Sequence, residues 1–168
     1  MQPTVSNAHI AALKKVVSVL NEHQIPYQIT GGFAGNIYGS LWPPHDIDLE
    51  VSAREMPLLA GLFADHITQP LHHFINDEFD LWLITLDIDG IEIDINQAEE
   101  CYLINKAGQK QLLCTDLSTA EVHDFMGIKV SVQPLEQLIA YKKTIGRVAD
   151  VADLSAIHPH KRPEPKLL

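Results

Sequence analysis

Two short segments of the chain alternate acidic and branched apolar residues, and this pattern constrains the fold more than any other feature. The segments read DIDLEV at 46–51 and IEIDIN at 91–96. Side chains alternate between the two faces of a strand, so each segment is predicted to form a strand with one apolar face and one acidic face. The apolar faces have to be buried, and the acidic faces must then meet water or a cation.

Carboxylates that share one face of a strand repel each other and raise each other's pKa unless a positive charge lies between them. A divalent metal ion is the usual solution, and hard oxygen ligands favour Mg²⁺, Mn²⁺ or Ca²⁺ over zinc. If the two strands are neighbours in one sheet, three or more acids converge. For either strand alone, an ordinary amphipathic strand with solvated acids is the alternative. The two strands together, downstream of a glycine pair, favour a metal site.

That glycine pair is Gly31-Gly32, which follows a predicted strand at 27–30 and precedes a helix-like segment. Glycine permits backbone conformations and close approaches that a side chain would block. A strand that leads into a helix through glycines leaves backbone N–H groups free to bind phosphate. The alternative is a tight connection without a ligand.

Helical spacing, capping residues and turn dipeptides predict the other elements. The first predicted helix runs from Ser6 or Asn7 to about His23, and the second covers 54–64 with Ser52 as its cap. The last two run from Pro134 to Ile145, ended by Gly146, and from Arg147 to near Pro159. Two hairpins are predicted, with strands 81–88 and 91–95 joined at Asp89-Gly90, and strands 121–125 and 128–132 joined at Met126-Gly127. No element is predicted for 101–117. The polar segment 65–77, which carries His66, His72 and His73, is predicted to be a loop whose histidines are solvated or contact a substrate.

Length and composition predict a single domain over 1–159, with a frayed tail at 160–168. No apolar run approaches the 18 or more residues of a membrane span, and the N-terminus lacks a signal-peptide pattern. Cys101 and Cys114 have no metal-like spacing and are predicted to be free thiols in a reducing cytoplasm. The net charge of −10 argues against tight non-specific binding to nucleic acid.

Taken together, Gly31-Gly32, Asp46-Ile47-Asp48 and a later Asp94 within an apolar strand resemble the nucleotidyltransferase superfamily related to DNA polymerase β. The segment LIAYK at 138–142, with Gly146, Arg147 and Asp150, resembles its bacterial AbiEii-type subgroup. The resemblance covers most of 28–157. Relatives often carry Arg and Thr shortly before the Asp-x-Asp motif, where this chain has Trp42 and Pro44.

The resemblance implies an α+β fold with a mixed sheet and flanking helices, two Mg²⁺ ions and a nucleoside triphosphate donor. It implies that Asp46 and Asp48 bind both metal ions, and that Asp94 binds the catalytic one and helps to deprotonate the acceptor. Gly31 and Gly32 would hold the phosphates of the donor. Two metal ions at such a site clamp the attacking and leaving oxygens of an in-line displacement.

Two basic residues of the C-terminal part carry further predictions. Lys142 is expected to offer its charge to the phosphates or the acceptor, or else to be a lysine that extends along the helix surface to water. Arg147 and Asp150 are expected to pair with each other at helical spacing.

The leading hypothesis is therefore an enzyme that transfers a nucleoside monophosphate to a hydroxyl of an RNA such as tRNA, a protein or a small molecule such as an antibiotic. The alternatives are a non-catalytic nucleotide- or partner-binding module, such as the toxin or antitoxin half of a pair, and a metal-dependent phosphohydrolase.

Overall fold

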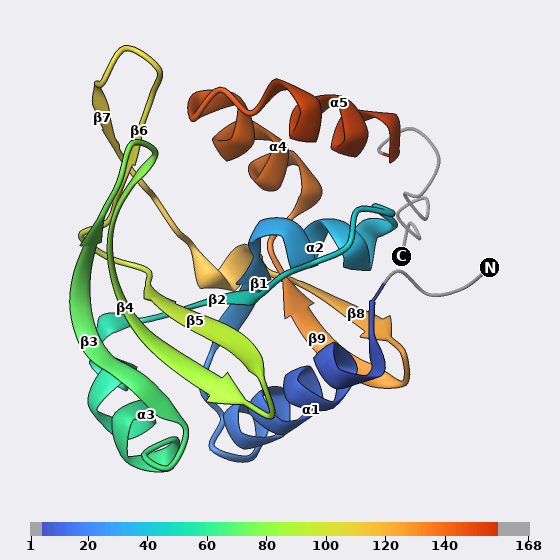
Figure 1. The fold of residues 1–168 in the computed structure, drawn as a ribbon, viewed down its shortest axis with the longest axis vertical. Coiled ribbons are helices and arrows are strands. Elements are labelled where there is room, and N and C mark those ends of the chain that lie inside the picture. Colours follow the sequence, from blue (N-terminus) through green and yellow to red (C-terminus); the bar gives the residue numbers. More distant parts are fainter. Residues whose placement is uncertain (1–4, 158–168) are drawn as a thin grey trace.

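The computed structural model describes residues 5–157, in which a mixed β-sheet carries helices on both faces (Figure 1). The strands are β1 (Tyr27–Thr30), β2 (Ile47–Val51), β3 (Ile67–Ile75), β4 (Phe79–Ile88), β5 (Ile91–Gln97), β6 (Tyr102–Ile104), β7 (Lys110–Leu112), β8 (Glu121–Phe125) and β9 (Ile128–Val132). The helices are α1 (Asn7–Glu22), α2 (Gly31–Tyr38), α3 (Met56–Leu62), α4 (Leu135–Thr144) and α5 (Val148–Ile157), with 3₁₀ turns η1 (Ala53–Glu55) and η2 (Leu117–Thr119). The α+β prediction is confirmed.

The centre of the sheet is β2, which pairs antiparallel with β1 and parallel with β5. The strand order is β7-β6-β4-β5-β2-β1-β9-β8, and β3 pairs with the outer edge of β4. The two acidic strands are thus neighbours, and their register places Asp48 opposite Asp94 and Glu50 opposite Asn96. The predicted convergence of the two acidic faces is confirmed.

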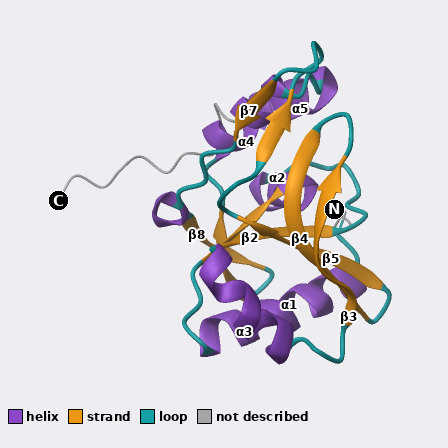
Figure 2. Ribbon diagram, turned by 90° about the vertical axis from the view of Figure 1, so that its left-hand side faces the viewer, coloured by secondary structure: helices purple, strands orange, loops and turns teal. Residues whose placement is uncertain are grey.

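The apolar faces of these strands form the core of the sheet's other side. Ile47, Leu49, Ile93 and Ile95 are completely buried. Both views place α1 and α3 on this side, whereas α2 lies on the acidic side (Figure 1, Figure 2). The helical spacing that predicted α1 is confirmed by its buried stripe, and the Ser6 side chain caps the helix by accepting a hydrogen bond from the His9 N–H. Alternation therefore buries one face of β2 and β5 and leaves the acids on the other.

Both predicted hairpins are present. The β4–β5 turn has Asp89 and Gly90 at φ values of 53° and 88°, the conformation of a tight two-residue hairpin turn. The predicted last helices are also present as α4 and α5, and Gly146 between them adopts a φ of 77°. The predicted helix 54–64 is shorter, because η1 precedes α3 and Pro57 stands in the first turn of α3.

The predicted loop at 65–77 is wrong. Residues 67–75 form β3, which pairs along β4 from Ile67 opposite Leu86 to Ile75 opposite Asp80. Most of its side chains are exposed, and register shifts interrupt it between Ile67 and His72, so no alternation of apolar and polar residues marks it in the sequence. The partner strand, rather than local sequence, makes this segment a strand.

The segment without a prediction, 101–117, contributes β6, β7 and the start of η2. Cys101 and Cys114 are free, as predicted. None of the helices within 5–157 combines the length and hydropathy needed to cross a bilayer. The predicted tail at 160–168 lies outside the described residues.

Candidate active site

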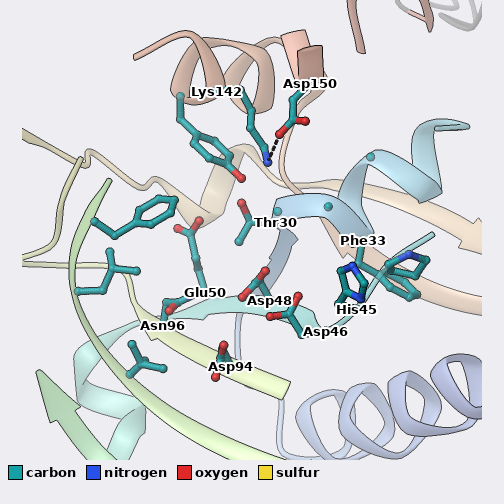
Figure 3. Close-up of a pocket in the computed structure, with 18 of the residues that line it drawn as sticks. Thr30, Phe33, His45, Asp46, Asp48, Glu50, Asp94, Asn96, Lys142 and Asp150 are labelled. Carbon is teal, nitrogen blue, oxygen red and sulfur yellow. Dashed lines mark hydrogen bonds and ion pairs between the residues drawn. The ribbon is translucent and has the colours of Figure 1, made fainter. Parts of the chain in front are cut away.

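A cavity of about 540 Å³ opens on the acidic side of the sheet (Figure 3). Its walls come from the sheet strands β2 to β6, the N-terminal half of α2, the loop that follows α2, and the facing helices α4 and α5. All of the residues predicted as site residues line it: Gly31, Gly32, Asp46, Asp48, Asp94 and Lys142. Residues far apart in the chain thus meet around one cavity.

Three carboxylates at the base of the cavity come close enough to share one cation. One oxygen each of Asp46, Glu92 and Asp94 lies within 4.8 Å of the other two. The predicted trio contained Asp48 in place of Glu92. Asp48 stands opposite Asp94 in the parallel register, and Asp46 and Glu92, each two residues earlier in the chain, come close to each other at the same end of the strands. Alternation in the sequence places Glu92 on the acidic face, but its proximity to Asp46 depends on the register between β2 and β5.

Burial and mutual repulsion act on the carboxyls of this cluster. Burial raises the pKa of Asp48 well above its ordinary value, and the neighbouring Asp46 and Asp94 raise it further. Burial also raises the pKa of Asp94 to about 6, with smaller contributions from Glu92 and Asp46, although the Thr85 hydroxyl donates a hydrogen bond of 2.8 Å to it. The site is therefore built to gain from a positive charge.

Gly31 brings the start of α2 against Asp48. Its φ of +67° is in the left-handed region, and a Cβ there would lie 2.5 Å from Asp48 Oδ2. The first N–H groups of a helix have no acceptor within the helix. The Thr30 side chain makes no capping hydrogen bond to them, and its hydroxyl donates to Gln133 Oε1 at 2.7 Å. The N-terminus of α2 therefore adds positive partial charge to the cavity. By contrast, nothing lies within 4 Å of a Cβ placed on Gly32.

Lys142 lies across the cavity from the acids, on α4. Only 6% of the residue is exposed, so it does not reach out to bulk water. Its Nζ donates to Asp150 Oδ2 at 3.0 Å (Figure 3). Asp150 also lies 3.6 Å from Arg147, which confirms the predicted Arg147–Asp150 pair. The stronger partner of Arg147 is Glu78, which it contacts through two hydrogen bonds of 2.7 and 2.8 Å.

The three histidines of the predicted loop have different surroundings. His72 lines the cavity. His73 points to the other side of β3, where it bonds to Asp80 and stacks on Trp82. His66 does not line the cavity. The predicted substrate contact therefore remains a hypothesis for His72 alone.

Comparison with known proteins places the chain in a family. The sequence matches the aminoglycoside-2''-adenylyltransferase family over residues 12–137. No curated protein matches the sequence.

Solved structures with the same fold include a nucleotidyltransferase of Thermotoga maritima, which is 18% identical, with a TM-score of 0.73 over 94% of this chain and 96% of that one. The lincosamide antibiotic adenylyltransferase LnuA, solved with lincomycin bound, is 12% identical, with a TM-score of 0.60 over 91% of this chain and 98% of that one. The antibiotic-resistance factor ANT(2'')-Ia is 13% identical, with a TM-score of 0.58 over 89% of this chain and 82% of that one. The chain belongs to the aminoglycoside-2''-adenylyltransferase family and is a nucleotidyltransferase.

Proposed function

We propose that the protein transfers a nucleoside monophosphate from Mg²⁺-bound ATP to a hydroxyl group of a small, antibiotic-like molecule. The observation that carries the proposal is the cluster of Asp46, Glu92 and Asp94 beside the N-terminus of α2 and below Lys142. The family name supports an adenylyl group and a small-molecule acceptor. Neither the family nor the fold neighbours support the predicted RNA and protein acceptors or an antitoxin partner.

The donor set of the cavity fits Mg²⁺. Its ligand atoms are carboxylate oxygens, with no cysteine or histidine in the close trio. Asp46, Glu92 and Asp94 would hold one ion, and Asp48, beside Asp46, would take part in binding the second. When bound, Mg²⁺ would offset the repulsion between the acids and neutralise phosphate oxygens.

The donor phosphates are expected between the start of α2 and Lys142. The N–H groups at Gly31 and Gly32 can donate to phosphate oxygens, and the helix dipole favours an anion there. Lys142 is held by Asp150 at 3.0 Å, which fixes its ammonium group over the cavity. A fixed positive charge of this kind stabilises the negative charge that develops on the departing pyrophosphate.

Asp94 is the proposed proton acceptor for the attacking hydroxyl. Burial raises the pKa of Asp94 to about 6 in the metal-free protein, and a bound Mg²⁺ would lower it, so the carboxylate would be ionised and able to accept a proton near neutral pH. The hydrogen bond from Thr85 fixes one of its oxygens. In the step, the acceptor oxygen bonds to the α-phosphorus, the bond to pyrophosphate breaks, and the hydroxyl proton passes to Asp94.

The test uses α-labelled ATP, CTP, GTP and UTP in turn, with Mg²⁺ and a panel of hydroxylated antibiotics that includes lincomycin and tobramycin. We expect label from ATP in the small-molecule fraction, and its loss in Asp48→Asn. Asp65→Asn, which removes an exposed carboxylate outside the cavity, is the matched control and should keep wild-type activity. Undiminished transfer by Asp48→Asn would refute the metal assignment. Hydrolysis of the nucleotide without transfer would favour the phosphohydrolase.

A further inference from the structure

We propose that Arg147 is a second cationic ligand of the donor's terminal phosphates, beside Lys142, and that Glu78 is the residue that positions Arg147 for this contact. The assignment rests on the proposed function and adds two residues to its donor site. Arg147 immediately precedes α5 and lines the cavity. Among residues 5–157, Lys142 and Arg147 are the two lysine or arginine residues that line it.

The guanidinium group of Arg147 binds Glu78 through one of its edges. Its Nε–H donates to Glu78 Oε2 at 2.8 Å, and an Nη2–H donates to Glu78 Oε1 at 2.7 Å. A guanidinium carries five N–H donors in a planar fork, so this carboxylate does not occupy the edge between Nη1 and Nη2. Two parallel hydrogen bonds also fix the plane of the group. Arg147 can therefore hold Glu78 and a phosphate oxygen in the cavity at the same time.

Glu78 can fix the orientation of Arg147 because the backbone of Glu78 is itself held on both sides. Its N–H donates to Asn76 Oδ1 at 2.9 Å, and its carbonyl accepts a hydrogen bond of 2.8 Å from the Ile104 N–H of β6. Glu78 lies in the turn between β3 and β4, whereas Arg147 lies between α4 and α5. The pair therefore fixes the guanidinium group relative to the sheet that carries the metal-binding acids.

The other edge of Arg147 faces the carboxylate that also holds Lys142. Asp150 Oδ2 lies 3.6 Å from Arg147 Nη1 and 3.0 Å from Lys142 Nζ. The contact with Arg147 is too long for a hydrogen bond, so Asp150 does not occupy the Nη1 donors. The two residues are also tied through the backbone, since the Arg147 N–H donates to the Lys142 carbonyl at 2.9 Å. Because both cationic groups approach one oxygen, they are close enough to contact neighbouring oxygens of one polyphosphate.

The exposure of Arg147 favours a ligand contact over a purely structural ion pair. Its side chain is 42% exposed, whereas that of Lys142 is 8% exposed. An ion pair that is open to water contributes only about 0–1 kcal/mol to stability, so the pair with Glu78 adds little to the fold. The guanidinium stays charged at any pH at which the protein is folded. The terminal phosphates of a nucleotide carry several negative charges, of which Lys142 alone could offset one.

The test measures equilibrium binding of three probes to the full chain by calorimetry, with Mg²⁺ and without an acceptor, so that no transfer is required. The probes are the α,β-methylene analogue of ATP, which cannot release pyrophosphate, inorganic pyrophosphate, and AMP. We expect Arg147→Met to bind the analogue and pyrophosphate at least about tenfold less tightly than the wild-type protein, the effect of losing one hydrogen bond from a charged group. The affinity for AMP should stay unchanged, because AMP lacks the terminal phosphates.

Lys106→Met is the matched control. Lys106 is exposed and lies against Gly146, next to Arg147, but it does not line the cavity, so all three affinities should stay unchanged. Glu78→Gln keeps the shape of the side chain but removes the charge that orients Arg147. We expect it to weaken binding of the analogue about threefold, the scale of an exposed ion pair, without affecting AMP. Added to Arg147→Met it should cause no further loss, because Glu78 acts through Arg147. Thermal melting checks that each variant is folded.

The outcomes distinguish this assignment from the proposed function. Unchanged affinity for the analogue in Arg147→Met, an equal loss for AMP, or an equal effect of Lys106→Met would overturn phosphate binding by Arg147 and leave nucleotidyl transfer standing. Tighter binding of the analogue by Glu78→Gln would overturn the positioning role of Glu78. A loss confined to the analogue and pyrophosphate would support the assignment even if no antibiotic accepts label, and that failure of transfer would count against the proposed function alone. No binding of the analogue by the wild-type protein would count against both.

Discussion

Replacing Asp94 by Asn should abolish transfer and at the same time make the metal-free protein more stable. Burial and the neighbouring carboxylates raise the pKa of Asp94 to about 6 from an ordinary value of 3.8. A carboxyl whose folded-state pKa is raised favours the protonated form in the fold, so its ionised form destabilises the protein above that pKa. Asn has nearly the same shape and keeps an oxygen that accepts the Thr85 hydrogen bond.

The size of the effect follows from the pKa. Each pH unit corresponds to about 1.4 kcal/mol, so the interval from 3.8 to about 6 corresponds to at most about 3 kcal/mol. Asp94 is partly exposed, and screening by water reduces this to about 1–2 kcal/mol. For a chain of this size, such a gain raises the melting temperature by about 2–8 °C.

The pH dependence has a definite sign. Below pH 3.8 the carboxyl is mostly protonated in both the folded and the unfolded state, so the substitution should change little there. The gain in the free energy of unfolding should grow from that pH to about 6 and stay constant above it. Urea titrations of the two proteins at several pH values, with a chelator present, measure this curve.

Asp65→Asn serves as the control, since it removes an exposed carboxylate outside the cavity and should leave the free energy of unfolding unchanged. A metal-free Asp94→Asn protein that is less stable than wild type near neutral pH would refute the reasoning. Such a result would mean that the carboxylate is stabilised by the fold itself and that no cation is needed to offset repulsion.

Three other changes test the remaining parts of the site. Gly31→Ala should lose most activity and about 1–3 kcal/mol of stability, because Gly31 has a left-handed φ and a Cβ there would meet Asp48. Gly32→Ala should be tolerated, because a Cβ there meets open space. Transfer assays and urea titrations of both variants measure the difference. Lys142→Met should lower kcat by roughly 10²-fold, as expected for the loss of one fixed charge. Lys143→Met, which removes the exposed neighbouring lysine, should leave kcat unchanged. Mg²⁺ with ATP at about 100 times Kd should stabilise the wild-type protein by about 2.7 kcal/mol, and a chelator should remove this gain in a thermal melt.

The sequence predicted those parts of the site that local alternation and turn chemistry determine. Branched apolar residues on one face of β2 and β5 leave only the other face for Asp48 and Asp94, whatever the rest of the fold. Glu92 was harder to assign, because its proximity to Asp46 depends on the register of two strands that lie far apart in the chain. A parallel register with Asp48 opposite Asp94 would have been sufficient to find it.

The apolar side of the cavity, lined by Phe74, Phe79, Leu81, Leu83 and Leu103, could not be predicted for a related reason. β3 is a mostly exposed edge strand, so its sequence carries no burial pattern, and Phe74 belongs to the cavity only because β3 pairs with β4. Leu103 reaches the cavity through a three-residue strand, β6, that is too short to leave a periodic pattern. Local sequence therefore indicated the acidic cluster, whereas the apolar side of the cavity depends on long-range pairing.

This division has an energetic counterpart within β2 and β5. Repulsion among the acids costs the metal-free fold a few kcal/mol, but Ile47, Leu49, Ile93 and Ile95 lie behind them and are completely buried. Each such side chain contributes about 1.5–3 kcal/mol by burial, so the four together exceed the cost of the acids. The alternating sequence thus places a destabilising functional face and the core that offsets it on the same two strands. Substitutions on the acidic face should therefore change activity without unfolding the protein, whereas truncation of any of the four apolar residues should destabilise the fold and lower activity only through unfolding.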